Sequence, residues 1–359
     1  MDELRLENAT KEYAGLIAVS GINLSVRKGE YLFILGPSGS GKSVLLRLIA
    51  GLEIPTSGSI YIRDIRANDI PPHNRNIPVV FQDFALFPHL TVRENIEYGL
   101  RIRSISKEDR RIKSTALLEL LNIRDMASKK PHQLSIGQKQ RVGLGRALAL
   151  EPSVLLLDEP LGALDANLHI KMQFELKQIQ KNLRVTFLQV THNQSDALAV
   201  ADRIAVMNQG HIEQIGSPAE IFSAPSSRFV AELLGNNNFF IGKVTGKEDG
   251  IFKVETNQGR FIVPAGKKSP YMGTDVAFVV RHDRLLINPK GSGLNKLKAQ
   301  FKGRTVRGSL VNYEFICEDQ TFRIETHISA GLLGFQSGES ALLGWKFSHG
   351  HLLPERSNV

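Results

Sequence analysis

Two glycines, a lysine and a serine stand at spacings suited to holding phosphate. The pattern G-x-x-x-x-G-K-[ST] is matched at every fixed position by the run Gly36, Pro37, Ser38, Gly39, Ser40, Gly41, Lys42 and Ser43. Glycines let backbone N–H groups curl around phosphate oxygens, and a helix N-terminus adds partial positive charge. In this pattern Lys42 reaches the β- and γ-phosphates, and Ser43 ligates Mg²⁺. An eight-residue match between an apolar run and a helix-like stretch disfavours a chance glycine turn.

Two neighbouring acids, Asp158 and Glu159, follow an apolar run at residues 154–157. Carboxylates at the end of a buried strand are costly unless a cationic or protic group uses them. Beside a phosphate loop, we expect Asp158 to hold Mg²⁺ through water. Glu159 would polarise the attacking water as general base.

Two further polar residues close apolar runs. Gln82 follows residues 79–81, and His192 follows an apolar run at 185–190. Taken alone, such a glutamine is more often a plain loop residue, and a lone histidine is usually structural. A glutamine that closes a buried strand could contact Mg²⁺ or water. A strand-end residue at the same edge of a parallel sheet as Asp158 and Glu159 would face the same crevice, which favours a γ-phosphate contact for His192.

A second anion site is indicated at Ser135, Gly137 and Gln138, at the start of a helix-like stretch. Ser135 is a good N-cap, and a helix begun by these residues offers free N–H groups and a hydroxyl. Tyr13 lies between the first two predicted strands. It would either stack on a purine ring or belong to the core or surface.

The elements that must position these residues alternate between strand and helix. Residues 4–10 and 22–26 alternate as half-exposed strands do, and 32–35 is a continuous apolar run typical of a strand buried on both faces. Residues 92–127 have helical spacing with many charges, which indicates an inserted helical piece. A helix is predicted over 168–182. The fold class predicted for this part is α/β.

Composition limits the class of protein. The chain has 359 residues, a formal net charge of +9 and one cysteine, Cys317. This length predicts at least two domains, and a lone cysteine excludes an internal disulfide and agrees with a reducing compartment. The charged start has no signal-peptide core, and no apolar stretch reaches about 18 residues, so we expect no membrane span. No dense basic run occurs, so we expect scattered surface charges.

From residue 239 onward helical patterns nearly vanish, and short alternating strands such as 252–256 and 261–263 dominate. Residues 273–281 resemble residues 338–346, each after an earlier pair of strands. This weak repeat predicts two related small β units, of the oligonucleotide-binding barrel type. Such barrels can bind nucleic acid, but no stripe of basic and aromatic residues is present.

Together these motifs resemble the nucleotide-binding subunit of an ATP-binding-cassette transporter, in the family's order and from Leu4 to about Gly235. The resemblance implies P-loop ATPase chemistry with ATP and Mg²⁺. It matches Tyr13 to the adenine-stacking aromatic, residues 134–138 to the signature sequence, Leu164-Asp165 to the loop that crosses the dimer interface, and His192 to the switch histidine. Three positions depart from the pattern. They are Ile136 in the signature, Gly162 where serine is common, and Asn193 where aspartate is common.

The resemblance also implies an assembly. Two copies would pair head to tail, with the phosphate loop of one and the signature helix of the other enclosing ATP. The expected domains are an ATPase at 1–235, with a helical subdomain at about 84–150, and a C-terminal β regulatory domain at 236–359. The helical subdomain and the Gln82 loop would receive an integral membrane permease, with 84–88 as an apolar contact surface. The subunit would lie on the cytoplasmic face of the cell membrane and serve an extracytoplasmic solute-binding protein indirectly.

Overall similarity is nearest to spermidine/putrescine importers, with ferric iron, molybdate or tungstate, sulfate and sugars as alternatives. No residue of the ATPase touches the cargo. A soluble cassette ATPase acting on nucleic acid is the alternative from another class, but it predicts tandem cassettes or coiled-coil insertions, which are absent. A third reading, in which the β domain senses a small anion and gates the ATPase, is compatible with the first. We expect no nucleic-acid partner.

Overall fold

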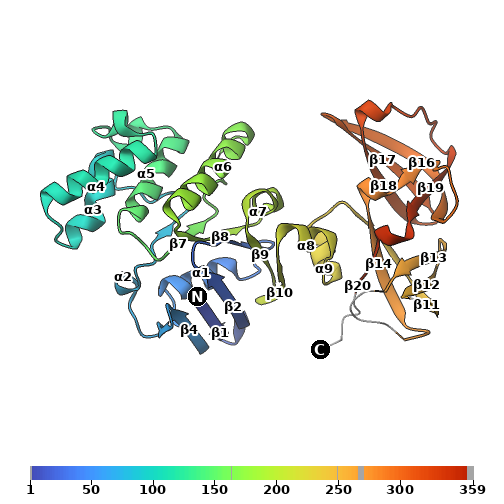
Figure 1. The fold of residues 1–359 in the computed structure, drawn as a ribbon, viewed down its shortest axis with the longest axis horizontal. Helices are drawn as coiled ribbons and strands as arrows, with labels where there is room; N and C mark the ends of the chain where they lie inside the picture. The colour runs from blue at the N-terminus through green and yellow to red at the C-terminus, as the bar shows by residue number, and fades with distance from the viewer. Residues whose placement is uncertain (1, 163, 249, 266–270, 354–359) are drawn as a thin grey trace. The chain divides into compact units, whose positions relative to one another are not determined.

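The computed structural model describes residues 2–162, 164–248, 250–265 and 271–353 (Figure 1). The chain forms two compact units, Met1–Ile221 and Phe222–Val359. Residues 222–235, which were predicted to belong to the ATPase domain, pack in the second unit. The boundary at 235/236 remains a prediction. Within the described ranges, no helix is long and apolar enough to cross a membrane.

The first unit is organised around a six-stranded sheet of order β10-β9-β3-β8-β7-β6. All neighbours except β9 and β10 pair in parallel. The carboxyl ends of the five parallel strands therefore lie at one edge, where α/β sheets bind their ligands. The strands are β3 (Tyr31–Leu35), β6 (Val79–Val80), β7 (Val154–Asp158), β8 (Thr186–Thr191), β9 (Arg203–Asn208) and β10 (His211–Gly216).

A second, antiparallel sheet of order β2-β1-β4-β5 packs in the same unit. Its buried side chains, such as Leu6 and Leu24, join one core with helix α1 (Lys42–Ala50) and with Leu156 and Leu188 of the main sheet. The alternation predicted for the first two strands is confirmed. Its strands are β1 (Asp2–Tyr13), β2 (Leu16–Arg27), β4 (Ser57–Ile62) and β5 (Ile65–Arg66).

The helical spacing predicted for residues 92–127 is confirmed, because two helices, α3 (Val92–Ile102) and α4 (Lys107–Leu120), lie within this stretch. Thr91 and Ser135 each cap a helix through a capping box, which satisfies N–H groups that a helix leaves unpaired. The helix predicted over 168–182 begins slightly earlier, because Asp165 caps it. The helices are α1 (Lys42–Ala50), α2 (Pro72–Arg75), α3 (Val92–Ile102), α4 (Lys107–Leu120), α5 (Ile136–Leu148), α6 (Ala166–Leu183), α7 (Gln194–Val200), α8 (Pro218–Ser223) and α9 (Arg228–Leu233).

The second unit has two five-stranded antiparallel sheets, of order β13-β12-β11-β14-β20 and β15-β19-β16-β17-β18. The repeated sequence segments fall on β14 and β19, which confirms the two related β units. The strands are β11 (Asn237–Glu248), β12 (Ile251–Thr256), β13 (Gly259–Pro264), β14 (Asp275–Arg281), β15 (Leu286–Ile287), β16 (Leu294–Arg307), β17 (Leu310–Cys317), β18 (Gln320–His327), β19 (Ser340–Lys346) and β20 (Gly350–Leu353).

The sequence repeat did not predict that the two β units within this second part of the chain exchange their last strands. β15 follows β14 in the chain but pairs with β19, and β20 follows β19 but pairs with β14. Two buried asparagines make matching contacts. Asn238 exchanges two hydrogen bonds with the backbone of Arg323, and Asn295 exchanges two with the backbone of Ile262. The exchange makes one shared core from both sheets.

Candidate active site

The phosphate loop joins β3 to α1 at the carboxyl edge of the sheet. Gly41 has φ 99°, a backbone conformation that favours glycine, and an added Cβ would lie 2.4 Å from the carbonyl oxygen of Ala18. An added Cβ on Gly36 would lie 2.3 Å from the carbonyl oxygen of Met207. No side chain caps α1 at Gly41, which leaves N–H groups at the helix start for another acceptor.

A cavity of about 570 Å³ opens over this loop. Six predicted residues line it, namely Ser38, Gly39, Gly41, Lys42, Ser43 and Glu159. Sequence reasoning missed six others, namely Leu16, Ile17, Ala18, Val44, Gln209 and Gly210. Gln209 and Gly210 follow β9, so their place after an apolar strand could have identified them. The exposed side chains of Leu16 and Ile17 supply an apolar wall.

Lys42 is the first residue of α1, and its side chain reaches back over the loop. Its Nζ donates to the carbonyl oxygens of Gly36 and Pro37, each at 2.8 Å. Burial lowers the pKa of Lys42, while Glu159 and Asp158 oppose this effect. An ammonium held near two acids at the helix start can bind a polyanion.

The two acids differ in their surroundings. Burial, followed by the charge of Glu159, raises the pKa of Asp158. Glu159 has φ 45°, an uncommon conformation for a residue with a side chain, and its backbone N–H donates to the carbonyl of Val190 at 3.1 Å. Nδ1 of His192 lies 2.8 Å from Oε1 of Glu159. The structure thus joins these predicted residues across β7 and β8.

The donor set suits a hard cation completed by phosphate oxygens. Among the residues that the structure describes, no three or more His, Cys, Asp or Glu form a group that could hold a metal. The predicted ligands are one carboxylate (Asp158), one hydroxyl (Ser43) and one amide (Gln82). Mg²⁺ is bound in this way, through one or two carboxylates together with substrate phosphates and waters. The residues present therefore fit Mg²⁺.

Gln82 and Tyr13 do not line the cavity. Gln82 is exposed, and a Cβ added to Gly162 would lie 3.3 Å from its Nε2, so the side chain lies against the loop that follows Glu159. Tyr13 is 38% exposed at the end of β1, with Nζ of Lys11 at 4.9 Å from its ring centroid. Tyr13 pairs with Leu16, so it shares the hairpin that supplies the apolar wall.

The signature residues also lie outside the lining of the cavity. Ser135 accepts from the backbone N–H of Gln138 at 3.4 Å, while the Gln138 side chain accepts from the Ser135 N–H at 2.9 Å. An added Cβ on Gly137 would meet the Leu168 side chain at 3.4 Å. Ile136 is 46% exposed. The second predicted anion site is thus separate from the cavity over the phosphate loop of the same chain.

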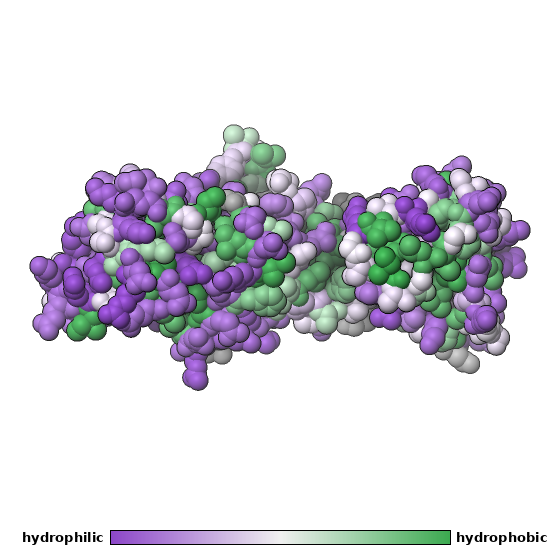
Figure 2. Space-filling view, turned by 90° about the horizontal axis from the view of Figure 1, so that it is seen from above, coloured by the Kyte–Doolittle hydropathy of each residue, from purple (hydrophilic) through white to green (hydrophobic). Residues whose placement is uncertain are grey.

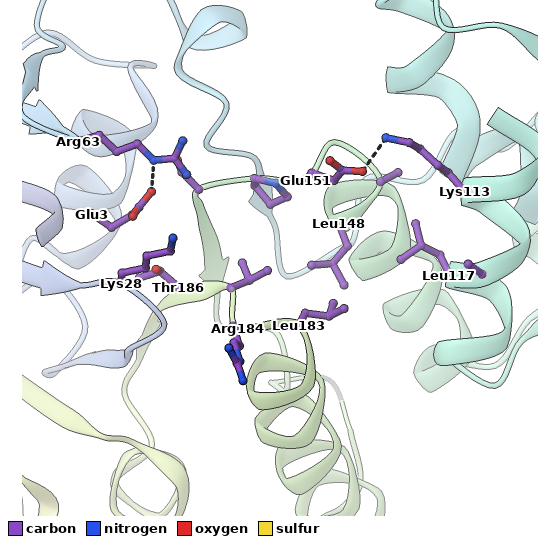
Figure 3. A pocket seen from close by; sticks show the side chains of 15 residues that line it. Glu3, Lys28, Arg63, Lys113, Leu117, Leu148, Glu151, Leu183, Arg184 and Thr186 are labelled. Atoms are coloured by element: carbon purple, nitrogen blue, oxygen red, sulfur yellow. Dashed lines mark hydrogen bonds and ion pairs between the residues drawn. The ribbon is translucent and has the colours of Figure 1, made fainter. Parts of the chain in front are cut away.

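Described residues of this unit also line two further hollows. One of about 420 Å³ is at the amino ends of β7 and β8, where Arg63 and Lys113 pair with its two acids, Glu3 and Glu151 (Figure 3). No glycine lines it, unlike the phosphate loop. The other is an apolar groove of about 320 Å³, lined by Ala50, Leu52, Pro72, His73, Asn76, Ile77, Pro78, Val79, Phe81, Arg103 and Leu150.

One predicted surface residue is buried instead. Phe84 is only 4% exposed, so the expectation that 84–88 forms one apolar surface is wrong at this position. The backbone turns Phe84 inward at φ 62°, and Arg146 on α5 donates to the carbonyl oxygens of Phe84 and Ala85 at 2.8 and 2.6 Å. The apolar run at 84–88 did not predict that Phe84 is buried, because the inward turn depends on a contact with Arg146 on a distant helix.

Known proteins resemble this chain in sequence. A family model described as ABC transporter matches residues 19–162. The spermidine/putrescine import ATP-binding protein PotA of Thermobifida fusca is 37% identical over 98% of this chain and 93% of its own. The Fe(3+) ions import ATP-binding protein FbpC of Fusobacterium nucleatum subsp. nucleatum is 44% identical over 71% of this chain and 69% of its own.

Solved structures of ATP-binding cassettes also resemble this chain. A dimeric structure of the ATP-binding cassette MJ0796, in a post-hydrolysis state with ADP and Pi, has a TM-score of 0.54 and 36% identity and covers 60% of this chain and 98% of that one. The cbiO1 structure from Clostridium perfringens, part of the ABC transporter complex cbiONQ, has a TM-score of 0.58 and 31% identity and covers 62% of this chain and 90% of that one. The chain therefore belongs to the ATP-binding subunits of ABC transporters and is an ATPase.

Proposed function

We propose that this ATPase powers the import of a polyamine, spermidine or putrescine, through a partner permease. The observation that carries the proposal is the match to PotA of Thermobifida fusca over 98% of this chain, which includes the C-terminal β unit. Other PotA relatives are up to 46% identical. The FbpC match covers 71% of the chain, so ferric iron is the weaker alternative.

In the proposed reaction, Lys42 and the loop N–H groups hold the triphosphate in the cavity. Mg²⁺, when bound, neutralises charge on the phosphates. Asp158, Ser43 and Gln82 would hold it. Glu159 accepts a proton from the attacking water. The bond between His192 and Glu159 keeps the Glu159 carboxylate turned toward the cavity.

The proposed active form is a homodimer. Ser135, Gly137 and Gln138 form a helix start that lies outside the cavity of their own chain. A second copy related by a two-fold axis would bring them to the nucleotide of the first. The similarity to a dimeric cassette structure supports this arrangement.

The apolar groove supports a permease contact. Leu52 and Phe81 are 50% and 37% exposed there, next to Gln82. A short amphipathic helix fits such a groove by burying its apolar face. The permease would hold the subunit at the cytoplasmic face of the membrane, and an extracytoplasmic solute-binding protein would deliver the cargo.

Transport by the reconstituted complex tests the cargo. Proteoliposomes that contain this chain and its permease, with the solute-binding protein outside, are given labelled spermidine, putrescine, ferric iron, sulfate, molybdate and maltose. We expect ATP-dependent uptake of the two polyamines alone. Uptake of another solute without polyamine uptake would overturn the cargo assignment. Stimulation of ATP hydrolysis by nucleic acid, without transport of any solute, would favour the alternative class.

A further inference from the structure

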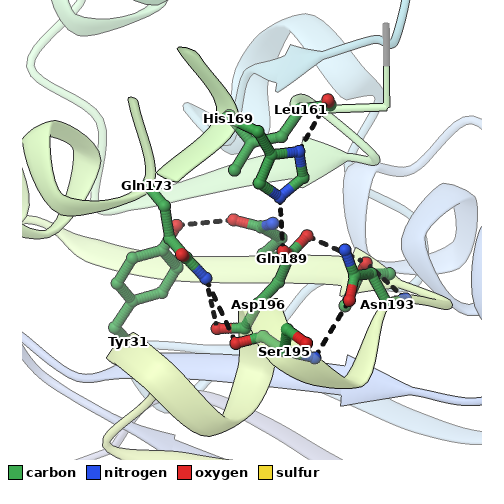
Figure 4. A network of polar contacts seen from close by, with 9 residues as sticks. Tyr31, Leu161, His169, Gln173, Gln189, Asn193, Ser195 and Asp196 are labelled. Atoms are coloured by element: carbon green, nitrogen blue, oxygen red, sulfur yellow. Dashed lines mark hydrogen bonds and ion pairs between the residues drawn. The ribbon is translucent and has the colours of Figure 1, made fainter. Parts of the chain in front are cut away.

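His169, near the start of α6, lies between two hydrogen-bond acceptors (Figure 4). Its Nδ1 is 3.2 Å from the carbonyl oxygen of Leu161, and its Nε2 is 2.5 Å from Oδ1 of Asp196. A carbonyl oxygen only accepts, so Nδ1 carries the hydrogen toward Leu161, and Nε2 shares a hydrogen with the Asp196 carboxyl. His169 therefore joins the loop just after Glu159 to the first turn of α7.

Asp196 extends this contact toward His192. It is 3% exposed, and a buried carboxylate is stable only when it is paired or hydrogen-bonded. Its Oδ2 accepts from the Thr191 hydroxyl at 3.4 Å, and the Thr191 hydroxyl oxygen accepts from the backbone N–H of Asn193 at 3.0 Å. These contacts hold the residues on both sides of His192.

The contacts close into a ring, because His192 also meets Glu159. Gln173 on α6 supports the ring by donating to the backbone carbonyls of Ser195 and Asp196 at 3.3 and 3.0 Å (Figure 4). Glu159 holds an uncommon backbone conformation at φ 45°, which persists only where the surroundings determine it strongly. In order, the ring runs through Glu159, Leu161, His169, Asp196, Thr191 and His192.

We propose that His169 and Asp196 are positioning residues for ATP hydrolysis. They fix the loop after Glu159 and the segment that carries His192 in one mutual geometry, and neither lines the cavity over the phosphate loop. The inference rests on the proposed role of Glu159 as the base. A misplacement of about 1 Å in a reacting group can cost about 100-fold in rate.

Three variants of the full chain separate the two bonds of His169. The amide nitrogen of His169→Asn replaces Nδ1, that of His169→Gln replaces Nε2, and His169→Ala removes both. Since the ring needs both bonds, we expect each variant to lower kcat by about 10-fold or more, with the KM for ATP within about twofold of the wild type. Lys177→Met is the matched control, because it breaks the ion pair of α6 with Asp202 and should leave kcat unchanged.

A double-mutant cycle excludes a merely structural effect. In the Glu159→Gln background the base is already lost, so His169→Ala should lower the residual turnover by less than about twofold. A kcat of His169→Ala equal to that of the wild type, or an equal loss in both backgrounds, overturns the positioning role while leaving Glu159 as the base. Normal turnover by Glu159→Gln alone overturns both, and so identifies the proposed base as the error.

Discussion

Nδ1 of His192, at the end of β8, lies 2.8 Å from Oε1 of Glu159, at the end of β7. The two strands are parallel neighbours, and the residues come from sequence positions far apart. Glu159 also lines the cavity over the phosphate loop, so its carboxylate meets both His192 and the space proposed for the nucleotide. The proposed catalytic carboxylate and the proposed switch histidine are therefore in contact within a single chain.

Removing the charge of Glu159 should abolish most hydrolysis. Glu159→Gln keeps the shape of the side chain but lacks a basic oxygen, so we expect kcat to fall by about two to four decades. Binding of ATP should persist, because Lys42 and the glycine loop are unchanged. Steady-state phosphate release and equilibrium binding of a fluorescent ATP analogue measure the two effects. Near-normal turnover would contradict the assignment of the base.

Removing the ammonium of Lys42 should weaken nucleotide binding. Loss of a charge-assisted hydrogen bond costs about 1.5–3 kcal/mol, so Lys42→Ala should raise the Kd for ATP by roughly one to two decades. Lys28→Ala is the control, because it removes the same charge from the hollow at the opposite strand ends. Calorimetric titration gives both values. An equal Kd for Lys42→Ala and the control would count against the contact.

A mixture of two inactive variants should regain activity if the sites are shared between copies. Lys42→Ala removes a phosphate contact, and the added carboxylate of Gly137→Asp should repel the γ-phosphate of the partner chain. The Gly137 position tolerates a Cβ, at 3.4 Å from Leu168. A mixed dimer then has one site with both lesions and one intact site, so part of the ATPase activity should return.

Sizing provides an independent check of the shared sites. The Glu159→Gln chain should elute as a dimer with Mg²⁺-ATP and as a smaller species without it. The shared-site arrangement would be contradicted by two results together. Mixing the two inactive variants would give no more activity than the sum of the two, and the chain would elute as a monomer at saturating ATP.

The C-terminal unit should lose stability in acid through His282. Burial, followed by the charge of Arg323, lowers the pKa of His282 from 6.5 to about 4. The unfolded chain binds the proton more readily, so this stability is fully present above pH 6.5 and is lost as pH falls toward 4. The full loss is on the order of 3 kcal/mol. Urea unfolding at pH 7 and pH 4.5 should show a smaller difference for His282→Gln than for the wild type. Equal differences would rule out this cause.

Much of the first unit could be predicted because its signals are local. The Ser135 cap, the strand before Asp158 and the glycine loop depend on residues close in sequence, so composition and spacing suffice. The order of strand ends predicted that Glu159 and His192 lie at one edge, and the structure adds a direct contact between them that was not predicted. The inward turn of Phe84 was missed, because a side chain of α5 imposes it.

The sequence by itself determined the phosphate loop, the strand and helix pattern and the repeat of two β units. Only the tertiary structure decided how distant segments meet. The ring through His169 and Asp196 needs α6 and α7 to pack across the sheet edge, and no spacing rule connects those residues. The exchange of β15 and β20 likewise depends on which strand edge each one meets. Strands bond to the edges that they meet in space. Because the two sequence repeats are related, the sequence alone allows β15 and β20 to pair with either β14 or β19.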